Sequence, residues 1–253
     1  MNILVTNDDG VYSEGLRRLA EAHGTIGRVT VVAPDREQSA SSHSLTLNHP
    51  LRILRLDDQT WSVDGTPADC VNLAVQHIMR DNRPDVVVSG INFGPNLGDD
   101  VIYSGTISAA FEGSILGIPS IAFSAVIGEN FSFERSAGFA VEFTRLFIES
   151  KPAHDVVMNV NFPVEAPRGV RITHLGKRVY TEGVIERQDP RGRSYFWIGG
   201  DAPEWEDVEG TDFAAIDRGY ISITPLHLDL THRPSIERLS RIREKLGPFD
   251  GDS

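Results

Sequence analysis

The sequence is short of cysteine, of basic residues and of long apolar runs. Cys70 is its single cysteine, so an intrachain disulfide cannot form and a cysteine-rich zinc site is excluded. No apolar run approaches the ~20 residues that a membrane-spanning helix needs, and no signal-like segment begins the chain, so we expect a cytoplasmic protein without membrane contact. The 24 Lys and Arg against 36 Asp and Glu give a net charge of -12. This balance argues against binding a nucleic acid, but one nucleotide as a substrate needs only a local site.

The pattern that is present is typical of an α/β protein. An apolar run at 3–5, a helical apolar spacing at 13–22 and a second apolar run at 29–33 follow one another. Strand, helix and strand within about 35 residues form a βαβ unit, which implies a parallel sheet and a right-handed crossover. Further strands are predicted at 85–92 and 118–123.

We predict a Rossmann-like, mostly parallel sheet with flanking helices over residues 1–177. The residue pattern then changes, because charged residues, glycines and isolated aromatics alternate without a helical period. We therefore assign residues 178–253 to a C-terminal extension that serves self-association. It consists of a projecting hairpin, a returning strand near 220–225 and a terminal helix at 235–246. Segment 45–47 is expected to be extended.

Polar residues follow three of the predicted strands. Asp8 and Asp9 come directly after the first strand, Ser39 lies in a hydroxyl-rich loop after the second, and Asn92 ends the strand at 85–92. In a doubly wound sheet these loops converge at one carboxyl edge. Adjacent carboxylates repel each other and need a cation or a proton, although Asp-Asp-Gly is also an ordinary turn sequence. An all-oxygen ligand set favours Mg²⁺, Mn²⁺ or Ca²⁺ over structural zinc.

A predicted helix starts with Ser104, Gly105 and Thr106. Its free backbone N–H groups, its two hydroxyls and its dipole suit an anion, whereas simple helix capping explains the same residues. Beside a metal, an anion site of this kind favours metal-assisted phosphoryl chemistry. A second acidic pair at 99–100 lies in mid-loop, where we expect it to be solvated or to support the site from outside.

Six segments match the motifs of one known family, in the expected order and across most of the chain. They are Ile3–Gly10, Ala33–Arg36 with Ser39, Gly65–Val71, Ser89–Asn92 with Gly94–Asn96, Ser104–Thr106 and Tyr220–Pro225. On these segments the chain resembles the SurE family of metal-dependent nucleoside-monophosphate phosphatases. The resemblance implies hydrolysis of nucleoside 5′- and 3′-monophosphates and, in some members, of short polyphosphate. It also implies homodimers that exchange C-terminal segments and can pair into homotetramers.

The resemblance further implies one divalent metal ion per subunit, Mg²⁺ or Mn²⁺, with Asp8, Asp9, Ser39 and Asn92 as its ligands. Phosphate contacts are implied for Asn96 and for the helix start at Ser104, Gly105 and Thr106. The chain departs from the family in one place. Ala40 follows the ligand serine, where many members have glycine, which shifts the loop slightly without removing the ligand.

The resulting hypothesis is hydrolysis by metal-activated water, with Asp8 and Asp9 as the catalytic residues. Asp9 is a candidate general base or a group that orients the water, and the sequence does not separate the two. His43 is a candidate proton donor to the leaving group, although a lone loop histidine is more often merely exposed. Two alternatives stay open: Asp8 as a nucleophile that forms an aspartyl-phosphate, and a regulatory protein that binds nucleotides without turnover.

Overall fold

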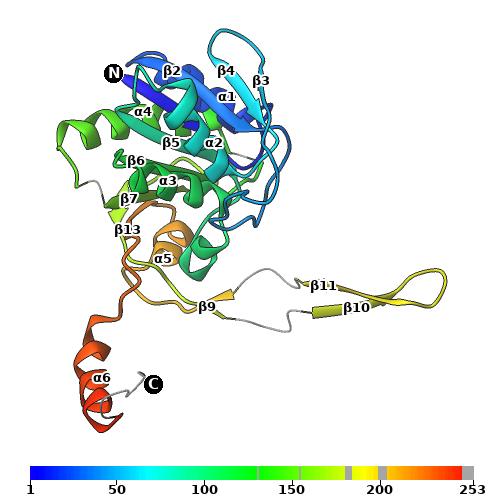
Figure 1. Cartoon of the computed structure of the whole chain (residues 1–253), viewed down its shortest axis with the longest axis vertical. Helices are drawn as coiled ribbons and strands as arrows, with labels where there is room; N and C mark the ends of the chain where they lie inside the picture. The colour runs from blue at the N-terminus through cyan, green and yellow to red at the C-terminus, as the bar shows by residue number, and fades with distance from the viewer. Residues whose placement is uncertain (130, 154, 180–183, 199–203, 247–253) are drawn as a thin grey trace, which may run out of the picture.

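The body of the protein is a nine-stranded sheet with helices on both faces (Figure 1). The structure is a computed structural model that describes residues 1–129, 131–153, 155–179, 184–198 and 204–246. The strands of the sheet are β1 (Asn2–Thr6), β2 (Arg28–Pro34), β3 (Ile53–Arg55), β4 (Thr60–Val63), β5 (Val86–Phe93), β6 (Ser120–Ala125), β7 (Val156–Phe162), β8 (Val170–Ile172) and β13 (Ile221–His227). The helices are α1 (Glu14–His23), α2 (Pro67–Leu73) with its π-helical continuation η1 (Ala74–Ile78), the 3₁₀ turn η2 (Gly98–Ile102), α3 (Gly105–Ile115), α4 (Phe133–Glu149), α5 (Asp212–Asp217) and α6 (Arg233–Leu246).

The sheet confirms the predicted fold class. Its strand order is β3-β4-β2-β1-β5-β6-β7-β13-β8, and the six strands from β4 to β7 pair in parallel. The chain runs outward from β1 through β2 to β4 and then returns to β5 on the other side of β1. Open α/β sheets bind ligands at such a reversal, beyond the carboxyl ends of the strands. The gap between the ends of β1 and β5 is therefore the expected binding position.

Two of the three hydrophobic clusters among the described residues lie on opposite faces of β1. Side chains alternate along β1, so Ile3 and Val5 enter the core that lies under α1 and α4, whereas Leu4 enters the core under α2 and α3. Strands buried on both faces read as continuous apolar runs, which is why β1, β2 and β5 were visible in the sequence. Cys70 lies in the second core, where burial raises the pKa of its thiol well above the usual value.

The C-terminal segment contributes both to the body and to projections from it. The returning strand β13 lies inside the main sheet, antiparallel to β7 and parallel to β8. The hairpin of β10 (Val184–Gln188) and β11 (Ser194–Ile198) extends away from the body, and α6 lies apart at the end of the described chain (Figure 1). At the base of the hairpin, β9 (Arg178–Val179) pairs with β12 (Glu204–Trp205). None of the described helices is both long and apolar enough to cross a membrane.

The local structure differs from the prediction in two short elements. Segment 45–47 lies outside the strands of the sheet; its Thr46 binds the Asp69 side chain through its backbone N–H and its hydroxyl, and Leu47 is 88% exposed. The turn η2 and the helix α5 were not predicted. Each is shorter than two helical turns, so neither has an apolar period that a sequence pattern can reveal.

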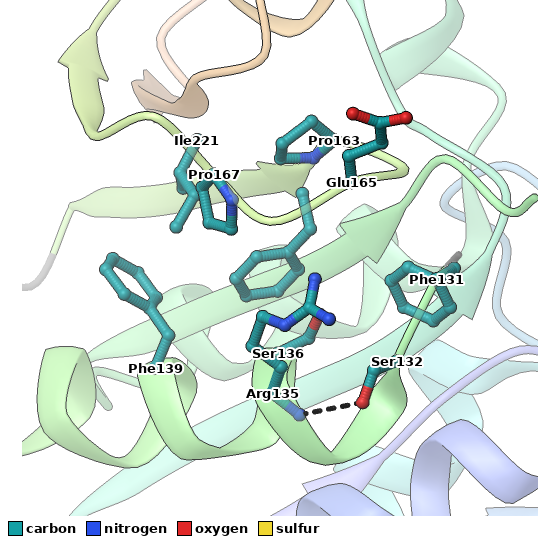
Figure 2. A pocket seen from close by; sticks show the side chains of 10 residues that line it. Phe131, Ser132, Arg135, Ser136, Phe139, Pro163, Glu165, Pro167 and Ile221 are labelled. Carbon is teal, nitrogen blue, oxygen red and sulfur yellow. Dashed lines mark hydrogen bonds between the residues drawn. The ribbon is translucent and has the colours of Figure 1, made fainter.

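A pocket of about 180 Å³ lies where the loop after β7 folds over the start of α4 (Figure 2). Phe131, Phe139 and Pro163 form much of its wall, and the side chain of Arg135 extends toward it. Its lining is mainly apolar and includes none of the predicted site residues. It is therefore a feature separate from the chemistry at the ends of β1 and β5.

His23 ties α1 to α4 inside the core. Its Nδ1 lies 2.8 Å from the Leu19 carbonyl oxygen, which only accepts, so Nδ1 carries the proton. Its Nε2 then accepts from the Thr144 hydroxyl at 3.0 Å. Burial lowers the pKa of His23 to about 4, from a usual 6.5, because the buried ring is more stable without a charge.

This pKa predicts acid destabilisation of the fold. The unfolded chain takes up a proton at His23 near pH 6.5 and the folded protein near pH 4, so stability falls as the pH drops through that window. Between pH 7.5 and 5.5 we expect the wild type to lose about 1.4 kcal/mol more than His23→Gln, measured by urea unfolding. Equal pH dependence of the two proteins would contradict the burial of a neutral His23.

Candidate metal centre and phosphate site

The structure brings the three predicted loops together at the carboxyl edge of the sheet. The backbone N–H of Gln38, next to Ser39, donates to the Asp8 carbonyl oxygen at 2.8 Å. The backbone N–H of Phe93, next to Asn92, donates to Asp9 Oδ2 at 3.1 Å. The loop that follows β2 and the last residue of β5 are thus both hydrogen-bonded to the acidic pair that follows β1. The predicted convergence of the loops is confirmed.

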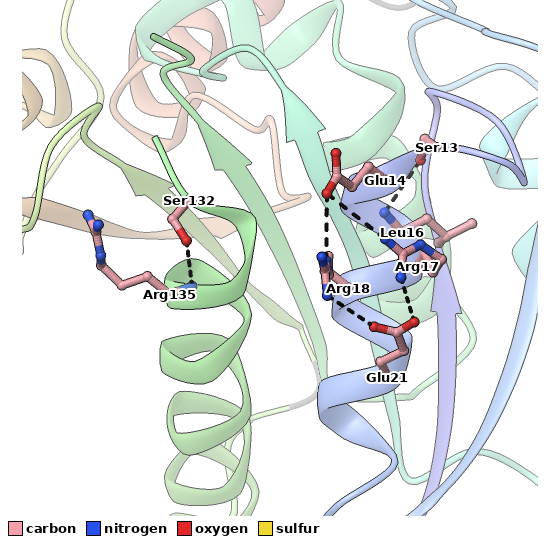
Figure 3. A network of polar contacts seen from close by, with 8 residues as sticks. All are labelled: Ser13, Glu14, Leu16, Arg17, Arg18, Glu21, Ser132 and Arg135. Atoms are coloured by element: carbon pink, nitrogen blue, oxygen red, sulfur yellow. Dashed lines mark hydrogen bonds and ion pairs between the residues drawn. The ribbon is translucent and has the colours of Figure 1, made fainter. Parts of the chain in front are cut away.

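The turn that carries the acidic pair is held by Asn7. Its side-chain Nδ2 donates to the Gly10 carbonyl oxygen at 3.1 Å and to Ser13 Oγ at 2.7 Å. The Ser13 hydroxyl in turn accepts from the Leu16 N–H and caps α1. On the exposed surface of this helix, Glu14 and Glu21 form ion pairs with two arginines (Figure 3). Gly10 has φ +95°, a conformation that glycine adopts without strain. The turn after β1 is therefore fixed from both ends.

Asp8 is packed directly against the start of α3. Its side chain is only 4% exposed, and its Oδ1 accepts a hydrogen bond from the Thr106 hydroxyl. A Cβ atom added to Gly105 would lie 2.7 Å from Asp8 Cβ and 2.9 Å from Ser41 Oγ, which is too close for either. The glycine of the Ser-Gly-Thr helix start therefore lets α3 approach the acidic pair. A cation at Asp8 and an anion at this helix start would be immediate neighbours.

The electrostatics of the acidic pair favour a bound cation. Burial raises the pKa of Asp8 to about 6, opposed by the hydrogen bond from Thr106 and reinforced by the charge of Asp9. Burial also raises the pKa of Asp9, opposed by the Phe93 N–H and reinforced by Glu37. Both carboxylates are thus less stable as anions than they are in water, and a cation held between them would remove that penalty.

Ser39 and Asn92 can complete an oxygen-ligand set. The Ser39 hydroxyl donates its proton to Glu37 Oε1 at 2.6 Å, so the lone pairs of the Ser39 oxygen could still bind a cation. Asn92 Nδ2 donates to the Gly94 carbonyl oxygen at 2.8 Å, so the amide oxygen faces away from that turn. Within the described ranges, no group of three or more His, Cys, Asp or Glu residues is arranged to hold a metal. A cation here would depend on hydroxyl and amide oxygens as well as the two carboxylates.

Unpartnered oxygen atoms cluster around the same edge. In the part of the chain that the structure describes, four buried side-chain oxygens have no hydrogen-bond partner, namely Thr6 Oγ1, Asn7 Oδ1, Ser41 Oγ and Ser89 Oγ. Thr6, the last residue of β1, is the register partner of Ser89 inside β5, and Ser41 lies in the loop that carries Ser39. Buried polar atoms normally find a partner. Their concentration here fits a site that binds a polar ligand.

The first turn of α3 contains the residues predicted to contact an anion. Ser104 Oγ accepts from the Ile107 N–H at 3.1 Å and caps the helix, so the capping explanation is correct for this hydroxyl. The Thr106 hydroxyl is directed to Asp8. Capping by Ser104 does not exclude an anion, because the first turn still presents backbone N–H groups and the positive end of the dipole.

Asn96 lies inside a buried cluster of asparagines. It is 8% exposed, and its side-chain Nδ2 donates to Ser124 Oγ at 2.7 Å. Asn161 Oδ1 accepts from its backbone N–H at 2.8 Å, and Asn159 Nδ2 donates to its carbonyl oxygen at 2.9 Å. The loop after β5 is thus anchored to β7. Two asparagines spaced i, i+2 in a strand share one face, and this spacing was the signal that could have revealed the cluster.

His43 lies against α3. Its Nε2 is 2.9 Å from Glu112 Oε2, and its ring stacks on Phe111 with a centroid separation of 6.5 Å. Glu112 is 3% exposed and also accepts from Asn72 Nδ2 at 2.9 Å. Glu112 and Asn72 were not predicted as site residues. They lie far from His43 in the sequence, so no local pattern joins them.

The C-terminal segment is bound to the turn η2. Asp212 accepts from the backbone N–H groups of Gly98 and Gly176, each at 2.8 Å. Arg178, at the base of the projecting hairpin, pairs with Asp100 at 2.8 Å and donates its backbone N–H to Asp99. The acidic pair at 99–100 is thus bound to the base of the hairpin, and its support of the site stays a prediction.

Known proteins match this chain in sequence and in fold. A family model described as Survival protein SurE matches residues 3–182. The 5′-nucleotidase SurE of Geobacter sulfurreducens is 51% identical over 243 residues, covering 94% of this chain and 92% of that protein. The 5′-nucleotidase SurE of Geotalea uraniireducens is 51% identical over 245 residues, covering 95% of this chain and 98% of that protein. The crystal structure of the SurE protein from Aquifex aeolicus aligns with a TM-score of 0.85 at 44% identity, covering 96% of this chain and 100% of that one.

The contact between Gly105 and Asp8 predicts the outcome of a glycine substitution. Gly105→Ala places a methyl group against atoms that cannot move away easily, so we expect a loss of about 1–3 kcal/mol in urea unfolding and weaker Mn²⁺ binding. Gly138→Ala is the matched control, because Gly138 lies in α4 with no atom near its added Cβ. The control should be neutral or stabilise by about 0.5–1 kcal/mol. Equal effects of the two substitutions would refute the close packing.

Proposed function

This chain belongs to the SurE family, and we propose that it is a divalent-metal-dependent phosphomonoesterase. Its proposed substrates are nucleoside 5′- and 3′-monophosphates, which it hydrolyses to nucleoside and phosphate, and short-chain polyphosphate. The relatives named 5′-nucleotidase support the nucleotide substrate. One observation in the structure carries the proposal: the start of α3, suited to an anion, is packed against the buried Asp8 of an acidic pair.

In this proposal one divalent cation per subunit, Mg²⁺ or Mn²⁺, is held by Asp8, Asp9, Ser39 and Asn92. The oxygen-only ligand set and the raised pKa values of the two aspartates support a hard cation. When bound, such a cation neutralises charge on a phosphoryl group and makes water more acidic.

The side chains of the site have separate proposed roles in the reaction. Asp8 is held by Thr106, so its position is fixed relative to the start of α3. Asp9 has one carboxylate oxygen bound to the Phe93 N–H, which leaves the other to accept a proton from the attacking water or to orient it. The turn at Ser104, Gly105 and Thr106 orients the phosphate. Phosphoryl transfer gains mainly from such positioning and from charge stabilisation.

Asn96 and His43 keep their proposed parts in this scheme. Asn96 is proposed to contact the phosphate from the loop that the buried asparagines anchor. His43 is the candidate proton donor to the leaving group, and its Nε2 is engaged with Glu112 in the structure. A donor in that position would have to leave Glu112 or to transfer its proton through the other ring nitrogen.

The exposed apolar surface of the C-terminal segment supports self-association. Ile236, Leu239 and Ile242 follow a three-residue spacing along α6 and are all more than half exposed. On the hairpin, Phe196 is 60% and Trp197 64% exposed. Exposed apolar groups of this size mark interaction surfaces. We propose that two copies exchange these segments to form a homodimer, and that dimers can pair into a homotetramer.

Replacing Asp8 tests the proposed activity. With Mn²⁺ and AMP we expect Asp8→Asn to lower kcat/KM by a factor on the order of 100 or more, because the variant loses one of two carboxylates that would hold the cation. Asp99→Asn is the matched control, since Asp99 belongs to the acidic pair that binds the hairpin base, and it should keep near-wild-type activity.

The same assay separates the alternatives. Wild-type protein that binds AMP but releases no phosphate would be a nucleotide-binding regulator and not an enzyme. Near-wild-type turnover and Mn²⁺ binding by Asp8→Asn would remove Asp8 from the metal site. Acid-quench trapping with labelled substrate reports the covalent route, because a nucleophilic Asp8 would carry the label and metal-activated water would not.

A further inference from the structure

The loop that carries Ser39 has no regular structure of its own. Residues 35–46, here called the serine loop, contain no helix or strand. Ala40 and Ser42 adopt φ values of 56° and 53°, a left-handed conformation that costs residues with a side chain about 1 kcal/mol or more each. A loop of this kind keeps one conformation only where its surroundings hold it. What holds the serine loop therefore decides where Ser39 lies.

Contacts on its backbone place the loop against the site. Gln38 donates its N–H to the Asp8 carbonyl oxygen, and Ser42 donates its N–H to the Tyr103 carbonyl oxygen at 3.1 Å. At the far end of the loop, Thr46 binds the buried carboxylate of Asp69 through its N–H at 2.9 Å and its hydroxyl at 2.7 Å. Between these points, two side-chain contacts hold the loop: the Thr66 hydroxyl donates to the Ser44 carbonyl oxygen at 2.7 Å, and His43 contacts Glu112.

The carboxylate of Glu112 is buried and accepts hydrogen bonds from two side chains. It is 3% exposed, and each of its two carboxylate oxygens has one partner, Oε2 with His43 and Oε1 with Asn72. The hydrogen bonds from His43 and Asn72 lower its pKa against the opposing effect of burial, so it is an anion. A buried carboxylate that loses a partner is strongly destabilised, which makes this contact selective for one position of His43.

Glu112 also lies on the helix that forms the anion site. Gly105, at the start of α3, packs on Asp8, and Glu112 lies in the same helix two turns further along. One rigid helix thus contacts the acidic pair at its start and the serine loop further on. The relative position of Asp8 and Ser39 is fixed through α3.

We propose that Glu112 is a positioning residue for the metal centre, with His43 as the latch between it and the serine loop and Asn72 as its second partner. The latch holds the serine loop in the conformation that presents Ser39 to the cation. This inference rests on the proposed function, because it takes Ser39 as a ligand. It assigns to His43 a task that requires no proton transfer, since the Nε2 atom serves as a hydrogen-bond partner of Glu112.

Mn²⁺ binding by calorimetry, without substrate, tests the latch. We expect Glu112→Ala and His43→Ala each to raise the Kd for Mn²⁺ by about 10–100-fold, the usual range for losing a group that orients a metal ligand. The double variant should bind no more weakly than either single variant, because both remove one interaction. His43→Gln keeps an N–H donor that can reach Glu112, and it should bind within about threefold of the wild type. Glu142→Ala, an exposed glutamate of α4, is the control.

Kinetics separate the latch from a proton donor. At saturating Mn²⁺ the latch predicts near-wild-type kcat for Glu112→Ala, whose effect should be a higher Mn²⁺ concentration for half-maximal activity. A proton donor predicts that His43→Gln lowers kcat and removes the alkaline limb of the profile, and that outcome would overturn the latch as the task of His43. Where Glu112→Ala does not fold, His43→Ala replaces it in the Mn²⁺-binding and hydrogen-exchange measurements.

Hydrogen exchange of the metal-free protein gives a readout that needs no activity. The latch predicts faster amide exchange at residues 38–46 in Glu112→Ala than in the wild type, with unchanged exchange in β1 and β5. Unchanged exchange together with wild-type Mn²⁺ affinity in Glu112→Ala would refute the latch and leave the proposed function standing. A wild type that neither binds Mn²⁺ nor releases phosphate from AMP would refute the proposed function, and the latch as a device for metal binding with it.

Discussion

Two neighbouring carboxylates after a buried strand have to be stabilised as anions, and much of the surrounding structure is arranged around them. Asp8 is almost fully buried and Asp9 partly so, and each has a raised pKa, because neither burial nor the charge of a neighbour suits an anion. The fold places this pair where the strand order reverses, between β1 and β5. It also brings the start of α3 against Asp8, through a glycine that leaves no room for a side chain. A cation and a phosphate together would satisfy both halves of this arrangement.

The irregular backbone around the pair is held by buried polar side chains. Asn159 and Asn161 anchor the loop after β5, Asp212 binds Gly98 further along, and Glu112 holds His43 in the serine loop. Each of these groups comes from a helix or strand of the body. Site residues on loops thereby gain the rigidity of the elements behind them, which positions ligands for charge stabilisation without reorganisation.

The sequence revealed what is local or periodic. Apolar runs located the parallel strands. Asp8 and Asp9 were found because they are adjacent and follow a strand. The supporting contacts were out of reach, since they join residues 69 positions apart for His43 and Glu112 and 114 apart for Gly98 and Asp212. Such pairs form only once packing has chosen the neighbours, and α5 is too short to leave a period.

The central claim is that the acidic pair belongs to a metal centre, and anomalous scattering from a crystal of the protein grown with Mn²⁺ tests it most directly. One strong peak per chain is predicted, bonded to the carboxylates of Asp8 and Asp9 and to oxygens of Ser39 and Asn92, at metal–oxygen distances near ~2.2 Å. The account is contradicted by a crystal of protein active with Mn²⁺ that shows no peak beside Asp8 and Asp9.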